Sequence, residues 1–277
     1  MFRALSLTVF LSLIAQPSSA DSVLRYQGPA THWTEALPVG NGRLGAMVFG
    51  GTGEELLQLN DSTLWSGEPR DWNNPAAKEI LPQIRAALFA GDYVQATALG
   101  KKMQGPYTQA YQPLGDLRLS FAGTDGATGY ERSLDLDRAV ATVRYTVDGA
   151  TFTREVFSSF PDQVIVVRLT CDQPGRIGFT VGADSLLRYS VQTDGRNGLI
   201  LRAKAPMHSE PSYRRVDGPI IKYDEGANPE GIAAELQVRV LNEGGRVVAG
   251  GSTLAVEKAD AVTLLLSAGT SFNGPDK

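Results

Sequence analysis

Apolar and polar residues alternate along most of the chain from residue 116 onward, in short runs separated by turn residues. Between residues 141 and 147 the odd positions are Ala, Val, Tyr and Val, and the even positions are Thr142, Arg144 and Thr146. A period of two predicts a strand with one buried face. Similar runs predict further strands of an antiparallel sheet protein: DLRLSF, ATFTREVF, QVIVVRLT, RIGFTVGA, GLILRAKA, IAAELQVRVL, STLAVEKA and AVTLLLSAG.

Two turn sequences are typical of hairpins. Asp148-Gly149 tolerates the positive φ angles of a tight two-residue turn, so the flanking runs are expected to pair. Glu243-Gly244-Gly245-Arg246 predicts a second hairpin on the same grounds.

The segment 75–103 breaks this pattern and predicts a short helical insertion. Its apolar residues at helical spacing are Ile80, Ile84, Ala87 and Leu88. Pro82 conflicts with one straight helix, because an interior proline costs about 3 kcal/mol. We therefore expect a kink, or a helix that begins nearer Leu81. The fold class is all-β: a large antiparallel two-sheet sandwich over about 21–272 that carries this helical insertion.

The ends of the expected helices are marked by residues with known capping roles. Asn74 followed by Pro75 suits a cap and a first helical position. Gly91 suits a stop, and Asp92 can cap a second short helix.

The first twenty residues predict a secretory signal peptide. Arg3 precedes an apolar core, and Ser18 and Ala20 have small-x-small spacing before Asp21. The alternative is a membrane anchor, but the apolar stretch is shorter than the roughly 20 residues that span a bilayer. We expect a mature domain over 21–277, secreted or periplasmic, without a membrane partner.

Composition excludes several classes of partner and site. The net charge is −4 and no Lys/Arg cluster occurs, which argues against nucleic acid. Cys171 is the single cysteine and lies in a strand-like run, so it is expected to be a buried apolar residue. His32 and His208 lie far apart in sequence, without a Cys/His cluster or an acidic calcium loop, so no metal site is expected.

The glycine-rich segment 40–45 matches G-x-G-x-x-G in letters only. That motif binds dinucleotides when it joins a strand to a helix inside a βαβ unit. Here a strand-like run, LGAMVFG, follows it, and no αβ alternation surrounds it. No G-x-S-x-G nucleophile elbow occurs either. We expect no cofactor.

The stretch LNDSTLWSGEPRDWNNP, residues 59–75, is the densest polar segment of the chain. It combines acids and amides with two of the three tryptophans, and this mixture suits sugars: polar groups bind the hydroxyls and aromatic rings stack on the C–H faces. The alternative is structural: the polar residues cap turns and the tryptophans fill the core. The sequence leaves both open.

Several long motifs together resemble glycoside hydrolase family 95, the α-L-fucosidases. They are EALPVGNGRLGAMVFGG, LLQLNDSTLWSGEPRDWNNP, YQPLGDLRLSF, the run from YERSLDLD to VIVVRLT, AKAPMHSEPSY and ADAVTLLLSAGTSFNG. The resemblance covers essentially all of 21–274 and concerns the family's amino-terminal domain. The amino-terminal sandwich of family 65 is similar in kind, but the sequences LNDSTLWSG and GNGRLGAMVFGG favour family 95.

The resemblance implies a β-sandwich that precedes a helical barrel, and hydrolysis of terminal α-L-fucose, typically α-1,2-linked, from glycans, with inversion and without a metal. In the family the catalytic carboxylates lie on the barrel, so no catalytic residue is assigned in 1–277, and a barrel is expected beyond Lys277. The chain alone is expected to be inactive. The alternative is a stand-alone carbohydrate-binding or structural module.

We predict that the segments containing PVGNGRLGAMVFGG and NDSTLWSGEPRDWNNP lie together at one end of the sandwich, facing that barrel. Gly40 and Gly42 would permit a tight turn, and Met47 and Phe49 would point inward along the strand that follows. The candidate substrate-binding residues are Trp33, Asn41, Arg43, Trp65 and Asp71.

Overall fold

Two antiparallel sheets form the body of the molecule. The computed structural model describes residues 22–274 except 70, 214 and 227–230, and the expected signal peptide therefore lies outside the described residues. The larger sheet contains, in spatial order, β1 Val23–Tyr26, β6 Thr128–Asp135, β7 Val140–Val147, β8 Ala150–Ser159, β9 Val164–Cys171, β18 Ala261–Thr270, β15 Ala233–Glu243, β12 Gly198–Lys204 and β11 Arg188–Asp194. The second contains β16 Arg246–Gly250, β17 Thr253–Ala259, β10 Ile177–Asp184, β5 Gly115–Ser120, β4 Glu54–Asp61, β3 Leu44–Val48 and β2 Leu37–Gly40.

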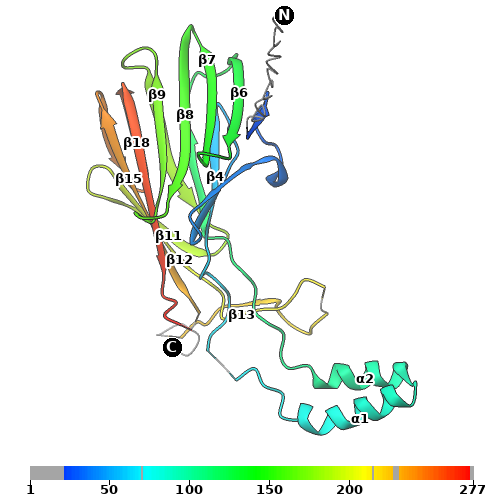
Figure 1. Cartoon of the computed structure of the whole chain (residues 1–277). Helices are drawn as coiled ribbons and strands as arrows, with labels where there is room; N and C mark the ends of the chain where they lie inside the picture. The colour runs from blue at the N-terminus through cyan, green and yellow to red at the C-terminus, as the bar shows by residue number, and fades with distance from the viewer. Residues whose placement is uncertain (1–21, 70, 214, 227–230, 275–277) are drawn as a thin grey trace, which may run out of the picture.

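The smaller elements lie outside these sheets. A short ribbon pairs β13 His208–Ser209 with β14 Ile221–Lys222, and the 3₁₀ turn η1 covers Trp33–Glu35. The two helices are α1 Ala77–Phe89 and α2 Tyr93–Met103. The predicted fold class, an all-β sandwich with a helical insertion, is confirmed (Figure 1). Within the described residues, no helix is long and apolar enough to cross a membrane.

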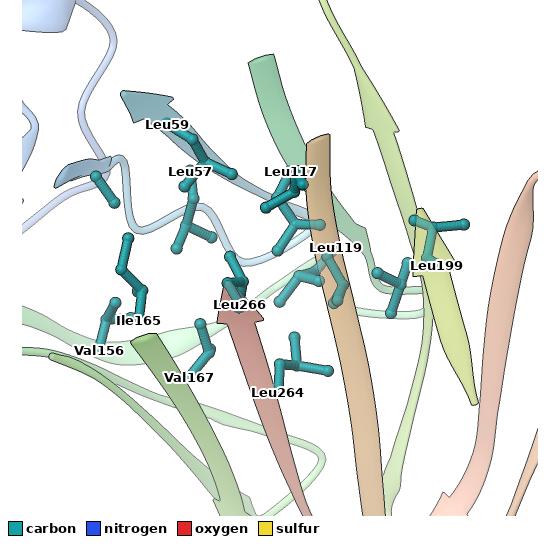
Figure 2. Packing of buried hydrophobic residues seen from close by; sticks show 14 of the residues in the cluster. Leu57, Leu59, Leu117, Leu119, Val156, Ile165, Val167, Leu199, Leu264 and Leu266 are labelled. Carbon is teal, nitrogen blue, oxygen red and sulfur yellow. The ribbon is translucent and has the colours of Figure 1, made fainter. Parts of the chain in front are cut away.

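The core lies between the two sheets and is built from alternate residues of each strand. Leu57 and Leu59 of β4 and Leu117 of β5 face Val167 and Leu264 of the other sheet (Figure 2). Each of these side chains is at most 2% exposed. Burying a leucine or valine side chain stabilises the fold by about 1.5–3 kcal/mol, so this layer is the main reason the sheets remain packed.

Strand β3 has the predicted period but the opposite face. Leu44, Ala46 and Val48 are buried, whereas Met47 and Phe49 lie on the other side and are half-buried. The prediction that Met47 and Phe49 point inward is therefore wrong. Because side chains alternate strictly along a strand, an error of one residue exchanges the two faces.

The two predicted hairpin turns have different outcomes. Asp148 and Gly149 have φ angles of 48° and 72°, and β7 pairs with β8 around them, as predicted. Gly244 and Gly245 also have positive φ, but they carry the chain from β15 in one sheet to β16 in the other. The second hairpin prediction is therefore wrong, because a local turn sequence does not specify which sheet the next strand joins.

The helical insertion forms an antiparallel pair that extends away from the sandwich (Figure 1). Asp92 accepts a hydrogen bond from the backbone N of Gln95 and caps α2, as predicted. Helix α1 begins at Ala77, upstream of Leu81, and contains Pro82. The side chain of Asn74 accepts from Ala76 N and donates to the carbonyl oxygens of Lys102 and Gln104. It therefore fixes the start of α1 against the end of α2, which explains a helix start upstream of the proline.

Candidate functional site

The candidate site lies where β4 ends and the chain leaves the sandwich toward the helices. Asp61, the last residue of β4, is fully buried, and its Oδ2 accepts from Arg43 Nη1 at 2.8 Å. Its Oδ1 accepts from the backbone N of Thr63 at 2.9 Å and from the Thr63 hydroxyl at 2.6 Å. The Thr63 oxygen lies 2.6 Å from the hydroxyl of Thr270, which therefore acts as the donor. The network joins β4 to β18 across the two sheets.

Asn41 and Arg43 hold the turn between β2 and β3 in this network. Asn41 Oδ1 accepts from the backbone N atoms of Arg43 and Leu44, and its Nδ2 donates to Ser159 O. Asn41 is 8% exposed, so its amide is directed into the sandwich and not across a domain contact as we predicted. Gly42 at the turn has φ 89°, which favours glycine.

Arg43 extends this bridge to the larger sheet. Its Nε donates to Gln163 Oε1 at 2.9 Å, and its Nη1 also donates to Ala268 O at 2.7 Å. The side chain is 33% exposed. Of the four residues predicted to cluster at one end of the sandwich, Asn41, Arg43 and Trp65 adjoin the end of β4, whereas Asp71 lies in a turn before α1. A contact of these residues with sugar stays a prediction.

A groove of ≈ 860 Å³ lies beside this network. Its wall includes Trp65, Trp72 and Phe272, with Glu68 and Gln109 as polar members. Trp65 is 44% exposed, and its ring meets Tyr111 edge to face at 5.3 Å. Burial and the negative charge of Asp61 raise the pKa of Tyr111, so its hydroxyl remains a neutral donor. The volume and the mixed lining are typical of a small-molecule site.

Glu68 supplies the carboxylate of the groove. Its Oε2 is buried, and no described residue forms a hydrogen bond with it. A buried oxygen without a partner costs about 1–3 kcal/mol, so it is a ready acceptor for a ligand or for another domain. Glu68 is the only acid among the described lining residues. Glycoside hydrolysis needs two carboxyl groups, and the described lining of this groove supplies one of them.

Gln109 holds the loop that forms the floor of the groove. Its Oε1 accepts from the Ser66 hydroxyl and from Ser209 N, each at 3.0 Å, and its Nε2 lies 3.0 Å from His208 Nδ1. Gly67 has φ 101°, and a Cβ there would lie 2.4 Å from Gln109 Cγ. The sequence analysis missed Gln109 and Tyr111, although Tyr111 opens the motif YQPLGDLRLSF. Their distance in sequence from residue 65 concealed the contact.

The other two candidates lie apart from the groove lining. Asp71 is exposed, and its Oδ1 accepts from the backbone N and the side-chain amide of Asn73, so it stabilises a turn before α1. Trp33 is 59% exposed on η1. It precedes the Leu37 end of β2, whereas Asn41 follows the Gly40 end, so Trp33 lies at the opposite end of that strand from Asn41.

No group of three or more His, Cys, Asp or Glu suited to a metal occurs within the described ranges. His208 Nε2 lies 3.0 Å from Glu210 Oε1, so both its ring nitrogens are used in the β13 region. Cys171 is half-buried in β9, less enclosed than the sequence suggested.

Comparison with known proteins assigns the chain to a family. A family profile described as "Glycosyl hydrolase family 65, N-terminal domain" matches residues 24–275. "Alpha-L-fucosidase 2" of Arabidopsis thaliana is 38% identical over 266 residues, which cover 94% of this chain and 31% of the relative. "Probable alpha-fucosidase A" of Aspergillus niger is 35% identical over 170 residues, 58% of this chain and 21% of that protein.

A solved structure assigned as a kojibiose phosphorylase, from the human microbiome, superposes with a TM-score of 0.46 at 10% identity and covers 93% of this chain and 33% of its own. The chain thus spans about a third of the length of the relatives matched over most of its residues. The family profile and the relatives named as α-fucosidases confirm the resemblance recognised in the sequence motifs. The chain belongs to the glycosyl hydrolase N-terminal β-sandwich domains that the family 65 profile describes.

Proposed function

We propose that this chain is the amino-terminal part of a secreted or periplasmic α-L-fucosidase and that its groove contributes to the rim of the sugar site. The relatives named α-fucosidases, whose sequences extend far beyond the matched region, support the enzyme class and a further catalytic domain. The proposed reaction is removal of terminal, α-1,2-linked L-fucose from glycans with inversion, with the catalytic carboxylates on a helical barrel.

The observation that carries the proposal is the composition of the groove. Trp65 offers a half-exposed aromatic ring, and the buried Oε2 of Glu68 has no partner among the described residues. An aromatic face next to an oxygen acceptor binds a pyranose, because the C–H face stacks on the ring while a hydroxyl donates to the carboxylate. Arg43 and Asn41 position this rim through Asp61.

The helical pair gives a second reason to expect a neighbouring domain on this side. The tip between α1 and α2 exposes apolar side chains: Phe89 is 91% exposed, Val94 84% and Tyr93 69%. The pair projects beyond the end of the sandwich at which the chain leaves β4 (Figure 1), and the groove-lining residues between 62 and 69 follow β4 directly. A cluster of exposed large apolar side chains marks a contact surface. We assign it to the barrel.

Two measurements test the proposal. The chain of 277 residues alone is expected to release no aryl alcohol from an aryl α-L-fucoside, because the described lining of the groove contains one carboxyl group, that of Glu68. Turnover that is lost in Glu68→Ala would place the active site in the sandwich and overturn the proposal.

In the longer protein that includes the barrel, Trp65→Ala and Glu68→Gln are expected to raise KM for the fucoside by about tenfold each, the loss of one ~1.4 kcal/mol contact. Trp33→Ala is the matched control at the other end of β2. A larger effect of Trp33→Ala would show that the other end of the sandwich faces the sugar. No effect of any variant would leave the groove with a purely structural role.

A further inference from the structure

A second cavity opens between the two sheets at the end of the sandwich far from the groove. Its volume is ≈ 270 Å³, and its lining includes Phe121, Tyr145, Phe152, Arg154 and Leu169. Strand β8 connects the two ends: Phe152 and Arg154 line this cavity, whereas Ser159 contacts Asn41. Arg154 and Ser159 are five residues apart in this strand, which is about 17 Å at ~3.3 Å per residue. The two sites are separate.

Arg154 is the polar group at the base of this cavity. It is 2% exposed, and its Nη2 forms an ion pair with Glu55 Oε2 at 2.5 Å and donates to Gly51 O at 2.7 Å. Its Nε and Nη1 are buried and have no hydrogen-bond partner of good geometry within the part of the chain that is described, although the Tyr145 hydroxyl lies close enough for the Arg154 side chain to affect the pKa of Tyr145. Buried guanidinium N–H groups without an acceptor are costly, so a molecule with acceptor oxygens is stabilised there.

The charge at the site is already balanced. Glu55 is fully buried, and Gly50 N and Leu56 N donate to its Oε1, so the carboxylate is held beside Arg154. Asp148 adds a further acid to the lining. Glu55 lies behind Arg154 and balances its charge, while Asp148 and Arg176, the two exposed charged residues of the described lining, have opposite signs. A neutral ligand with hydroxyl or ring oxygens fits these charges better.

Aromatic rings form the walls. The guanidinium of Arg154 lies over the ring of Phe121 at 5.3 Å, and Tyr145 stacks on Phe152 at 5.5 Å with an interplanar angle of 17°. Rings at this position favour the C–H face of a saturated ring. The volume is slightly below the ~300–1,000 Å³ of pockets for drug-sized molecules, so it suits one small ring.

We propose that this cavity binds a neutral molecule the size of a monosaccharide, with its ring against Phe121 and an oxygen accepting from Nε or Nη1 of Arg154. The site does not depend on the fucosidase assignment, because none of its residues lies at the groove. It carries no carboxyl pair open to the ligand and is a binding site without catalysis.

The test follows the Nε–H resonance of Arg154 by NMR while D-glucose, D-galactose or L-fucose is titrated into the purified protein. A saturable shift with at least one neutral sugar is expected. In Val147→Phe, which fills the cavity from its wall, binding is expected to weaken at least about tenfold. Phe121→Ala, which removes the opposite wall, provides the same measurement if Val147→Phe does not fold.

Trp65→Ala, at the other groove, is the control and is expected to leave this titration unchanged. These expected results do not depend on whether the fucosidase proposal is correct. Absence of a shift with all three sugars would mean that the cavity holds water only, and the proposal would be wrong. Tighter binding of D-glucuronate than of D-glucose would overturn the assignment to a neutral ligand.

Discussion

Strand β4 places one buried carboxylate at each end of the sandwich, and the two carboxylates differ in how their arginine partners are bonded. Its inward residues are Glu55, Leu57, Leu59 and Asp61. Glu55 pairs with Arg154, and both are almost completely enclosed, whereas Asp61 pairs with an Arg43 that is 33% exposed. The Asp61 pair has further partners in Ala268 of β18 and in Thr63 and Gln163 of two turns, but the Arg154 guanidinium retains unsatisfied N–H groups. An ion pair whose hydrogen bonds are made within the protein stabilises the surface that a neighbouring domain would contact. An ion pair with unsatisfied N–H groups can still donate to a ligand.

The largest expected effect breaks the enclosed pair. Arg154→Met leaves Glu55 buried without its counter-charge and is expected to lower the free energy of unfolding by about 3–5 kcal/mol. Burial raises the pKa of Glu55, and the Arg154 charge opposes this. Without that charge the folded-state pKa rises further, so the stability of the variant is expected to fall as pH rises above the unfolded value of 4.5. Urea unfolding across this pH range measures both effects.

The matched control for this variant is Glu55→Leu combined with Arg154→Met, which replaces the pair with apolar groups. It is expected to recover most of the loss. A double variant as unstable as the single one would show that the pair is required for reasons other than charge.

A smaller effect is expected at the other end of β4. Asp61→Asn removes the charge that binds Arg43 but keeps an acceptor for Thr63, so the free energy of unfolding is expected to fall by about 1–3 kcal/mol. Arg43→Gln is expected to cost less, because Arg43 is partly hydrated and Asp61 retains both Thr63 bonds. The same urea measurement applies. Equal losses for Asp61→Asn and Arg154→Met would remove the contrast between the ends.

Alkaline pH tests the enclosed end separately. The Tyr130 hydroxyl donates to Gly50 O at 2.6 Å, and burial raises its pKa to about 12 from the ordinary tyrosine value of 10.0. Because the unfolded chain ionises first, stability is lost as pH rises from about 10 through 12. Between pH 10 and 12 the melting temperature of Tyr130→Phe is expected to fall less than that of the unchanged protein. The exposed Tyr93→Phe serves as the control, and an equally small fall there would contradict the assignment.

The smallest effect concerns the helical pair. Asp92→Ala removes the cap on Gln95 N and is expected to cost about 1 kcal/mol of local helix stability. Because the pair extends away from the sheets, hydrogen exchange is expected to speed up over 93–103 and to remain unchanged in β4. Asp92→Asn retains a capping oxygen and is the control. Faster exchange in both regions would show that the pair and the sandwich unfold together.

Local patterns predicted most of the strands and the cap of α2, because alternation and capping depend on near neighbours in sequence, but α1 has Ala76 and not Asn74 at its N-cap. Asp148-Gly149 and Asp92 are examples. The same reasoning failed at Gly244-Gly245, where the destination of the chain depends on which sheet has a free edge. It also failed at Met47, where the face of the strand depends on partners in β4 and β2.

The candidate site was only partly predictable for a related reason. Trp65 was identified because its segment combines aromatic and polar residues, and Arg43 because it is a polar residue beside the glycine turn of its motif. Gln109, Tyr111 and Phe272 reach the groove from segments distant in sequence, and no local pattern indicates this. Asn41 was expected to face outward, but its amide is needed to satisfy two backbone N–H groups of the turn.

The path from β4 to β5 has a consequence for how the domain evolves. The two strands are adjacent antiparallel neighbours, with Leu59 opposite Gly115, so the intervening chain leaves and returns at the same place in the sheet. Everything between them, including the groove loop and both helices, is topologically a single hairpin loop. Lengthening a loop costs little conformational entropy, about 0.6 kcal/mol for each doubling. The outer part of this excursion, with both helices, can therefore be lengthened, shortened or replaced without moving the strands of the two sheets, so selection can act on recognition while the scaffold is inherited unchanged.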